Sequence, residues 1–374
     1  MADSFWLEEQ TEPLRSPRYD GHVEVAVIGG GVTGCSCALT LVENGLRVRV
    51  HEARSIASGA SGRNGGFALR GGAMPYHTAR ATLGTERAAW LWRLTERTLE
   101  RMEGLAGDAL RRVGSLQLAA DEKERDELGA EYKALLADGF EANWIDEPAG
   151  RLAGRYKAAI FHPRDGALQP ARWIRRLAAH AAEAGVDIRE HDRATSLEDL
   201  DAEVTVVASD GYPSGLLNEV DELVQPIRGQ VVVTEPLGEQ LYERPHYARR
   251  GFDYWQQLPD GRLVVGGRRD TDPEAESTAE EMTTPEVQAA LEAFVEELVG
   301  RMPAITHRWA GIFGSSPDSL PLVGQVPRRE NTWVSRGYSG HGNVLGLACG
   351  DLVAKAILGR REPELELFDP ARLL

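Results

Sequence analysis

Hydrophobic and polar positions near the start of the chain change their period twice. Residues 23–28 (VEVAVI) are almost continuously apolar, a glycine cluster follows, and residues 35–44 then place apolar side chains at helical spacing. Residues 46–50 alternate between apolar and polar side chains, which is typical of a strand. Because a helix joins the two strands, the pattern predicts a parallel β-strand, helix, β-strand unit.

Helical spacing and strand-like patterns also recur in the rest of the chain, where they predict two kinds of sheet. Predicted helices span residues 86–105, 121–137, 173–184, 285–299 and 343–358, and predicted strands span 113–119, 186–189, 204–209, 231–234, 252–258 and 263–265. The apolar run at 204–209 indicates a strand buried in a parallel sheet. Asp260-Gly261 is a hairpin signal between the last two strands, and a long acidic loop at 270–282 follows them. We therefore expect an α/β domain of Rossmann type and an α+β domain with an antiparallel sheet.

Length and charge limit the function. The chain has 374 residues, which favours two domains with a ligand cleft between them. A formal net charge of -16 without a basic cluster argues against nucleic acid or an anionic membrane as partner. No stretch reaches the roughly 18 apolar residues of a membrane span, and the N-terminus lacks a secretory pattern. We expect a cytoplasmic protein that acts on a small molecule.

The three cysteines do not indicate a disulfide or a metal site. Cys35 and Cys37 are one residue apart on a predicted helix, where their side chains diverge, and Cys349 is distant in the sequence. We expect all three to be small, buried apolar side chains.

A first glycine motif follows the first predicted strand. Gly29, Gly31 and Gly34 form the pattern GxGxxG at the start of a helix, where glycine permits a tight turn and close approach of a pyrophosphate. Glu52 ends the second strand, 23 positions after Gly29, where its carboxylate can accept both ribose hydroxyls of an adenosine. The combination predicts a dinucleotide site.

Two further glycine-rich segments favour FAD over NAD. Residues 59–66 (GASGRNGG) place Ser61, Arg63 and Asn64 between glycines, as donors for a long cofactor. Residues 336–343 (RGYSGHGN) precede the last predicted helix, whose free N–H groups can stabilise the negative charge of a reduced flavin. The alternatives are a surface loop and a simple capping turn.

Together these motifs resemble the D-amino-acid oxidase type of FAD oxidoreductases, which includes glycine oxidase, monomeric sarcosine oxidase and gamma-glutamylputrescine oxidase. The resemblance covers nearly the whole chain and is most specific at 27–34 (VIGGGVTG), 59–66, 308–311 (RWAG) and 337–342 (GYSGHG). The second and last of these segments are most similar to gamma-glutamylputrescine oxidase.

The resemblance implies a p-hydroxybenzoate-hydroxylase-like layout, in which the antiparallel sheet of a substrate domain covers a flavin held by a discontinuous Rossmann-like domain. The expected parts are an N-terminal arm at 1–20, an FAD-binding domain at 21–85, 150–215 and 308–374, and a substrate domain at 86–149 and 216–307. Sarcosine oxidases attach their flavin to a cysteine that would fall near Gly311, away from the three cysteines here. The resemblance therefore implies non-covalent FAD.

The expected FAD-binding residues lie in or beside these segments. They are Gly29, Gly30, Gly31, Val32, Thr33, Gly34, Glu52, Ala53, Arg54, Gly59, Ala60, Ser61, Gly62, Arg63, Asn64, Gly65, Gly66, Phe67, Ala194, Ala208, Ser209, Gly211, Gly311, Gly314, Gly337, Gly340, His341, Gly342, Asn343 and Val344.

The implied reaction is hydride transfer from a carbon beside an amine nitrogen to flavin N5. The imine is then hydrolysed, and electrons pass to O2 or another acceptor. Candidate catalytic residues are His341, Tyr254, Tyr338 and Arg268. His341 could bind through its backbone, tune the local charge or move a proton.

Departures from the family limit the substrate prediction. Where glycine oxidase has arginines that clamp a carboxylate, this chain has Phe313 and Gly340, and the oxygen-activating lysine of sarcosine oxidase falls near Val264. A polyamine derivative or secondary amine is therefore favoured as substrate. Alternative carboxylate anchors, which could equally be exposed arginines, are Arg70, Arg268 and Arg269.

Aromatic residues are candidates for the pocket wall, although ordinary packing explains them too. Tyr254 and Trp255 point in opposite directions on a strand, so only one should face the cleft. The other candidates are Phe67, Phe313 and Tyr338.

Two other functions remain open on the same fold. A 2-hydroxyacid dehydrogenase would also deliver hydride to a flavin, and a pair of arginines facing the flavin would favour it. A non-catalytic FAD-binding partner subunit would also keep the cofactor motifs. The oligomeric state is not predicted.

Overall fold

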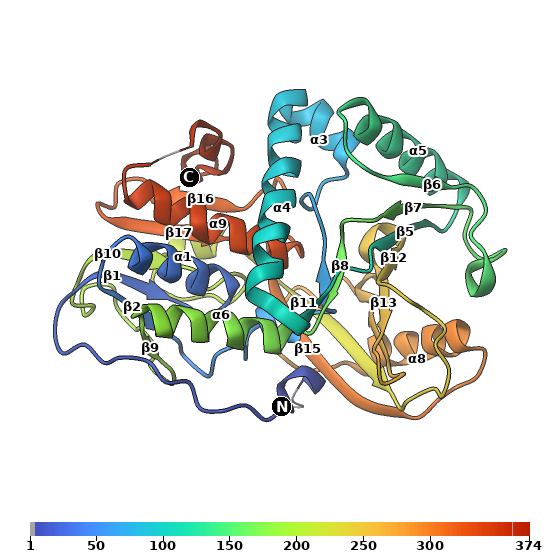
Figure 1. Ribbon diagram of the computed structural model, residues 1–374, viewed down its shortest axis with the longest axis horizontal. Helices are drawn as coiled ribbons and strands as arrows, with labels where there is room; N and C mark the ends of the chain where they lie inside the picture. The colour runs from blue at the N-terminus through green and yellow to red at the C-terminus, as the bar shows by residue number, and fades with distance from the viewer. Residues whose placement is uncertain (1–3, 361) are drawn as a thin grey trace.

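The computed structural model describes residues 4–360 and 362–374, which form two large sheets with helices packed on them (Figure 1). One six-stranded sheet has the order β16-β17-β10-β1-β2-β9 and is parallel except for β16. Its strands are β1 (Val23–Ile28), β2 (Val48–His51), β9 (Asp187–Arg189), β10 (Ala202–Val207), β16 (Leu322–Gln325) and β17 (Thr332–Arg336). We call it the parallel sheet.

Three helices cover the parallel sheet. They are α1 (Val32–Glu43), α6 (Pro170–Ala184) and α9 (Gly342–Ile357), and α4 (Thr85–Ala106) lies across α6 and α9. Their apolar faces join the sheet in one core, in which Cys35, Cys37 and Cys349 are free and buried. The expectation of small buried cysteines is confirmed.

The eight-stranded sheet has the order β15-β11-β14-β13-β12-β5-β7-β6 and is antiparallel except where β12 meets β5. We call it the antiparallel sheet. Its strands are β5 (Ser115–Ala119), β6 (Asn143–Ile145), β7 (Ala158–His162), β11 (Gln225–Thr234), β12 (His246–Ala248), β13 (Asp253–Gln257), β14 (Leu263–Gly267) and β15 (Ile305–Ser315). Helix α8 (Pro285–Val299) packs on β11 and β14, and α5 (Glu122–Ala137) packs on β5 and β7. In Figure 1 the two sheets occupy opposite halves of the molecule.

Shorter elements connect the halves. A three-stranded sheet joins β3 (Phe67–Ala68), β8 (Gly166–Leu168) and β4 (Leu110–Arg111). The remaining helices are α2 (Ala60–Arg63), α3 (Tyr76–Leu83) and α7 (Asn218–Asp221), and the 3-10 segments are Phe5–Leu7, Gly107–Ala109, Gly150–Leu152, Arg249–Gly251, Arg269–Thr271, Pro363–Phe368 and Pro370–Arg372. In the part of the chain described, no helix is long and apolar enough to cross a bilayer.

Two strands correct the expected domain boundaries. β7 falls within 150–215 and most of β15 falls within 308–374, both expected in the FAD-binding domain, yet both strands belong to the antiparallel sheet. β15 pairs with β11 along its whole length, so the chain leaves this sheet only after Ser315. The cause is hydrogen-bond pairing between distant strands, which apolar periodicity in one segment cannot reveal.

The expected N-terminal arm is partly fixed to the molecule. Trp6 is buried, and its indole N–H donates to the Asn64 carbonyl at 2.8 Å. Ser4 Oγ donates to the Gly62 carbonyl at 3.3 Å. The arm thus packs against the second glycine segment. Residues 1–3 of the arm lie outside the described residues.

Candidate active site

The carboxyl ends of three parallel strands meet at a cavity of about 140 Å³. Gly29 follows β1, Glu52 follows β2 and Ala208 follows β10, and all three residues line this space. Ile28 pairs with both His51 and Val207, which places the three strand ends side by side. Ligands of open α/β sheets bind at this edge. We call it the nucleotide cavity.

Close packing explains two glycines of the first motif. A Cβ on Gly34 would lie 1.9 Å from the Gly29 carbonyl oxygen, so any side chain there would push α1 away from β1. Gly29 has φ of +109°, and a Cβ there would lie 2.6 Å from the Ala208 carbonyl oxygen. The glycines allow the helix to begin directly above the strand ends, where its amides can face a phosphate.

Glu52 is held rigidly at the same edge. Its Oε2 accepts a hydrogen bond from the Gly30 amide and its Oε1 accepts one from the Arg54 amide, both at 2.8 Å. Each oxygen keeps a second lone pair, and Glu52 lines the nucleotide cavity. This geometry is suited to accept the hydroxyls of a ribose.

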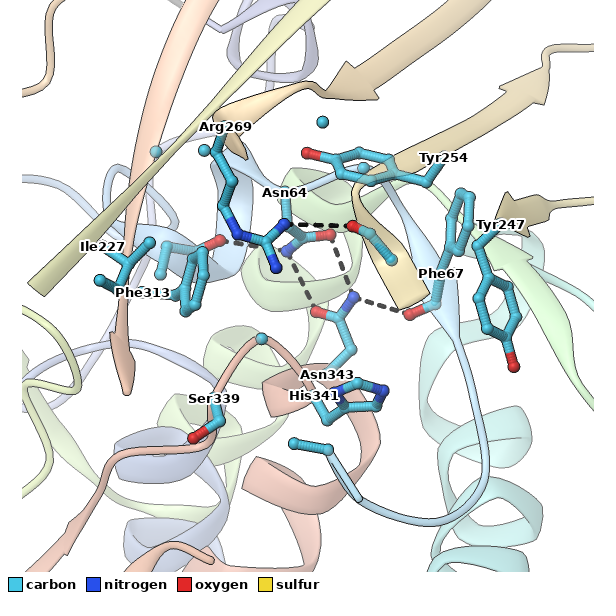
Figure 2. Close-up of a pocket in the computed structure, with 18 of the residues that line it drawn as sticks. Asn64, Phe67, Ile227, Tyr247, Tyr254, Arg269, Phe313, Ser339, His341 and Asn343 are labelled. Carbon is cyan, nitrogen blue, oxygen red and sulfur yellow. Dashed lines mark hydrogen bonds between the residues drawn. The ribbon is translucent and has the colours of Figure 1, made fainter. Parts of the chain in front are cut away.

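A second cavity, of about 490 Å³, lies between the two sheets, and we call it the substrate cavity. Figure 2 shows part of its lining, contributed by α2, β3, β11, β12, β13, β15 and the start of α9. Ala60 lines both cavities, so they adjoin at α2.

A pair of asparagines joins the two later glycine segments at the substrate cavity. Asn64 Nδ2 donates to Asn343 Oδ1 at 3.1 Å, and Asn343 Nδ2 donates back to Asn64 Oδ1 at 3.0 Å (Figure 2). Asn343 also donates to the Phe67 carbonyl at 2.8 Å. Segments nearly 280 residues apart in sequence are thereby held in one arrangement, with the first turn of α9 facing the cavity.

Aromatic rings form the walls. Tyr254 and Phe67 meet edge to face with ring centres 5.8 Å apart, and both line the cavity with Phe313. Gly266 makes room for the Tyr254 ring, since a Cβ on it would lie 2.3 Å from a ring carbon. Trp255 instead points into the core below α8, stacked on His246. Only one member of the Tyr254–Trp255 pair faces the cavity, as strand alternation predicts.

The three arginines considered as carboxylate anchors have different surroundings. Arg70 is buried outside the cavity, where it pairs with Asp165 and Glu96. Arg268 pairs with Asp253 and lies 4.5 Å over the ring of Phe294, on the α8 side of the sheet. Arg269 lines the substrate cavity.

Two catalytic candidates of the third glycine segment also differ in position. His341 lines the cavity, and its Nδ1 is buried without a hydrogen-bond partner in the described chain. Burial lowers the pKa of His341, so its ring is neutral near pH 7. Tyr338 lies behind the cavity, where its hydroxyl bonds to Thr33 and Ser335 at 2.9 Å each. The structure gives Tyr338 a packing position and not a position facing substrate.

Most of the expected FAD-binding residues line one of the cavities. Those at the nucleotide cavity are Gly29, Gly30, Gly31, Glu52, Ala53, Arg54, Gly59, Ala60, Ser61, Ala194, Ala208 and Ser209. Those at the substrate cavity are Ala60, Arg63, Asn64, Gly65, Phe67, Gly311, Gly340, His341, Asn343 and Val344. Neither cavity is lined by Val32, Thr33, Gly34, Gly62, Gly66, Gly211, Gly314, Gly337 or Gly342.

Sequence reasoning missed several lining residues. Tyr212 and Asp210 lie at the nucleotide cavity, and Asp210 accepts hydrogen bonds from the amides of Gly314 and Gly337 at 3.1 and 3.0 Å. Burial raises the pKa of Asp210 although these bonds oppose the shift. Tyr247 lines the substrate cavity from β12, a strand too short to show a period. The one sequence signal that could have identified Asp210 is the apolar strand that ends just before it.

The paired cavities fit a long dinucleotide better than a mononucleotide. One cavity presents the Glu52 carboxylate, and the other presents the unpartnered His341 Nδ1 beside the first turn of α9. These groups fit FAD, whose adenosine would be held by the residues of the nucleotide cavity and whose flavin would be held by those of the second cavity. No cysteine lines either cavity.

Known proteins are similar to this chain in sequence and in fold. The DAO family, described as FAD dependent oxidoreductase, matches residues 24–356. The probable oxidoreductase OrdL of Haemophilus influenzae is 26% identical, over 98% of this chain and 90% of the relative. Gamma-glutamylputrescine oxidoreductase of Escherichia coli is 28% identical, over 91% of this chain and 84% of the relative.

The crystal structure of glycine oxidase from Geobacillus kaustophilus matches 95% of this chain and 100% of its own with a TM-score of 0.76 at 24% identity. L-proline dehydrogenase from P. horikoshii matches 95% of this chain and 98% of its own with a TM-score of 0.78 at 20% identity. These likenesses confirm the expected fold. The chain belongs to the DAO family of FAD-dependent oxidoreductases.

Proposed function

We propose that this chain oxidises a primary or secondary amine that also carries a carboxylate, such as a glutamylated polyamine, and passes the electrons to O2. Bound FAD would supply the hydride acceptor. The observation that carries the proposal is Arg269, a cation at the wall of the substrate cavity, stacked beside the aromatic rings of Phe252 and Phe313.

Arg269 has spare hydrogen-bonding capacity. Its guanidinium carbon lies 4.2 Å over the ring of Phe252 and 5.8 Å from that of Phe313, and its Nη1 donates to the Gly251 carbonyl at 3.1 Å. It forms no ion pair within residues 4–360 and 362–374, and burial lowers its pKa. A guanidinium that is stacked, partly dehydrated and unpaired favours a bidentate carboxylate partner.

The other lining arginines are already engaged. Arg250 pairs with Glu127 at 2.7 Å, and Arg63 donates to the carbonyls of Ser58 and Ala310 at 2.7 and 3.3 Å. Arg269 is therefore the arginine that best suits the substrate. Arg269 belongs to the segment after β14. It would therefore bind a carboxylate from a different place than the arginines of glycine oxidase, whose positions are occupied here by Phe313 and Gly340.

The aromatic wall and His341 suit the amine end. Tyr254 and Phe67 present aromatic surfaces that attract an alkylammonium group. His341 is neutral, and its Nδ1 can accept a proton from the ammonium, which leaves the free amine that hydride loss requires. The rings also exclude water from the reacting carbon. Hydride transfer from the amine then requires only correct positioning of the substrate and one proton acceptor.

The test is anaerobic mixing of the FAD-loaded protein with matched donors while the absorbance of oxidised flavin is followed. We expect reduction by amines that carry a carboxylate and weaker reduction by the same amines as neutral amides. Reduction by 2-hydroxyacids alone would establish the dehydrogenase alternative, and no reduction by any donor would favour a non-catalytic subunit. Oxygen consumption during turnover tests O2 as acceptor.

Arg269→Met gives a residue-level test with Arg250→Met as the matched control at the same cavity. Loss of a charged anchor should lower kcat/KM for a carboxylate-bearing amine by about a hundredfold, mainly through KM. The neutral amide of that amine should show little change. Equal losses for both substrates would contradict an anchoring role for Arg269.

A further inference from the structure

The acidic segment between β14 and α8 is attached to both halves of the molecule. It contains two carboxylates with little exposure, Glu276 and Glu281, whose side chains are 1% and 5% accessible. Neighbouring acids such as Glu274 and Glu280 are exposed. A buried carboxylate requires a hydrogen-bonded or charged partner, so the partners of these two residues show where the segment is attached.

Glu276 fixes one end to the antiparallel sheet. Arg228 on β11 donates to it through Nε at 3.0 Å and Nη2 at 2.7 Å, and Gln230 on the same strand donates through Nε2 at 2.9 Å. Arg228 is itself buried. This anchor sets the path along which the segment leaves the substrate cavity.

Glu281 fixes the other end to the nucleotide cavity. Arg54 donates to its two oxygens at 2.7 and 3.2 Å, the Tyr212 hydroxyl donates to Oε1, and Arg63 Nε forms an ion pair with Oε1 at 3.8 Å. The Arg54 guanidinium carbon also lies 5.2 Å from the Tyr212 ring centre. Arg54 and Tyr212 both line the nucleotide cavity, so a residue of the antiparallel half controls two side chains of the parallel half.

Glu281 is charged in this arrangement. Burial alone raises the pKa of Glu281, but the hydrogen bonds from Arg54 and Tyr212 outweigh it, and the net pKa falls below the usual glutamate value. A bidentate carboxylate holds a guanidinium in one plane, whereas a single contact leaves it free to rotate. Side-chain freedom of Arg54 is thus removed before any nucleotide arrives.

We propose that Glu281 is a positioning residue for FAD, acting through Arg54 and Tyr212 to lock the nucleotide half of the cofactor from the opposite domain. The inference rests on the FAD cofactor and is independent of the amine substrate. It gives the acidic segment a role: the contact between Glu281 and Arg54 slows FAD release, so retention of the cofactor depends on how the two halves meet at this point.

The experiment measures FAD release from the strongly diluted holoenzyme by the rise in fluorescence of free flavin. Glu281→Gln keeps the shape but removes the charge, and we expect release about tenfold faster or more, because charge-assisted hydrogen bonds to Arg54 are lost. Glu280→Gln is the matched control, with the same change on an adjacent exposed residue, and should release FAD at the wild-type rate. An unchanged rate in Glu281→Gln would overturn the proposal.

A double-mutant cycle separates this role from general destabilisation. If Glu281 acts through Arg54, then Glu281→Gln should add little to the FAD dissociation constant once Arg54→Met is present. Fully additive effects of the two substitutions would overturn the positioning role. Glu276→Gln provides the comparison, because it breaks the other anchor and leaves the Glu281 contact with Arg54 in place, so it should change the FAD dissociation constant less than Glu281→Gln does.

Discussion

The two cavities of this protein are built in different ways. The nucleotide cavity is formed mainly by residues that follow directly after β1, β2 and β10, so its position is set by strand pairing. The substrate cavity uses long side chains from both halves, including Tyr254 and Arg269. The first is a property of a local motif, whereas the second depends on how two sheets face each other.

The difference explains how family members can share a cofactor and differ in substrate. The glycines of the nucleotide cavity cannot be substituted without moving the strands beside them. Residues that line the substrate cavity, such as Phe313 and Arg269, can be substituted without altering the sheet. Substitutions at the two cavities should therefore have separable effects.

The largest effect is expected where backbone contact is closest. Gly34→Ala would place a Cβ 1.9 Å from the Gly29 carbonyl oxygen and force α1 away from β1. We expect protein purified without flavin and destabilised by about 3 kcal/mol or more, measured by flavin content and urea unfolding. Gly104→Ala is the control, since a Cβ there meets nothing within 4 Å. Retention of FAD by Gly34→Ala would show that the nucleotide cavity is less rigid than its geometry indicates.

A smaller effect is expected from acid, through two buried histidines of the antiparallel sheet. At about pH 5 each histidine should lower the free energy of unfolding by about 2 kcal/mol. Burial lowers the pKa of His162 to about 4 and that of His246 to about 3. Both pKa values lie below the pKa of a histidine in the unfolded chain, about 6.5. The stability that the neutral side chains contribute is therefore fully present above about pH 6.5 and is lost as the pH falls below it.

Urea unfolding at about pH 7.5 and about pH 5 checks this loss. His246→Phe should make the protein less sensitive to acid, because a phenyl ring can replace the imidazole that stacks on Trp255 without taking up a proton. His180→Phe, the same substitution at an exposed position, is the control. Equal acid sensitivity in all three proteins would assign the effect to other groups.

The smallest effect is expected behind the substrate cavity. Tyr338→Phe removes a hydroxyl bonded to Thr33 and Ser335, which should lower stability by about 1 kcal/mol and leave kcat/KM unchanged. Thermal unfolding and steady-state kinetics measure both quantities. A loss of kcat/KM comparable to that of Arg269→Met would place Tyr338 with the catalytic residues and weaken the distinction between wall and packing.

Local patterns predicted the elements with clear periodicity. The helix expected at 285–299 coincides with α8, and the predicted βαβ unit forms β1, α1 and β2. The Asp260-Gly261 signal correctly joins β13 and β14. Short strands such as β12 and edge strands such as β16 gave no period long enough to detect.

The sequence by itself determined the parallel sheet edge, the glycine turns and the place of Glu52, because these depend on contacts within one βαβ unit. It could not choose among Arg70, Arg268 and Arg269. Arg268 has φ of +57°, which turns it toward Asp253, while the next residue faces the cavity. Only the tertiary structure decided which arginine lines the substrate cavity and that Glu281 reaches Arg54, because both follow from long-range packing of the two halves.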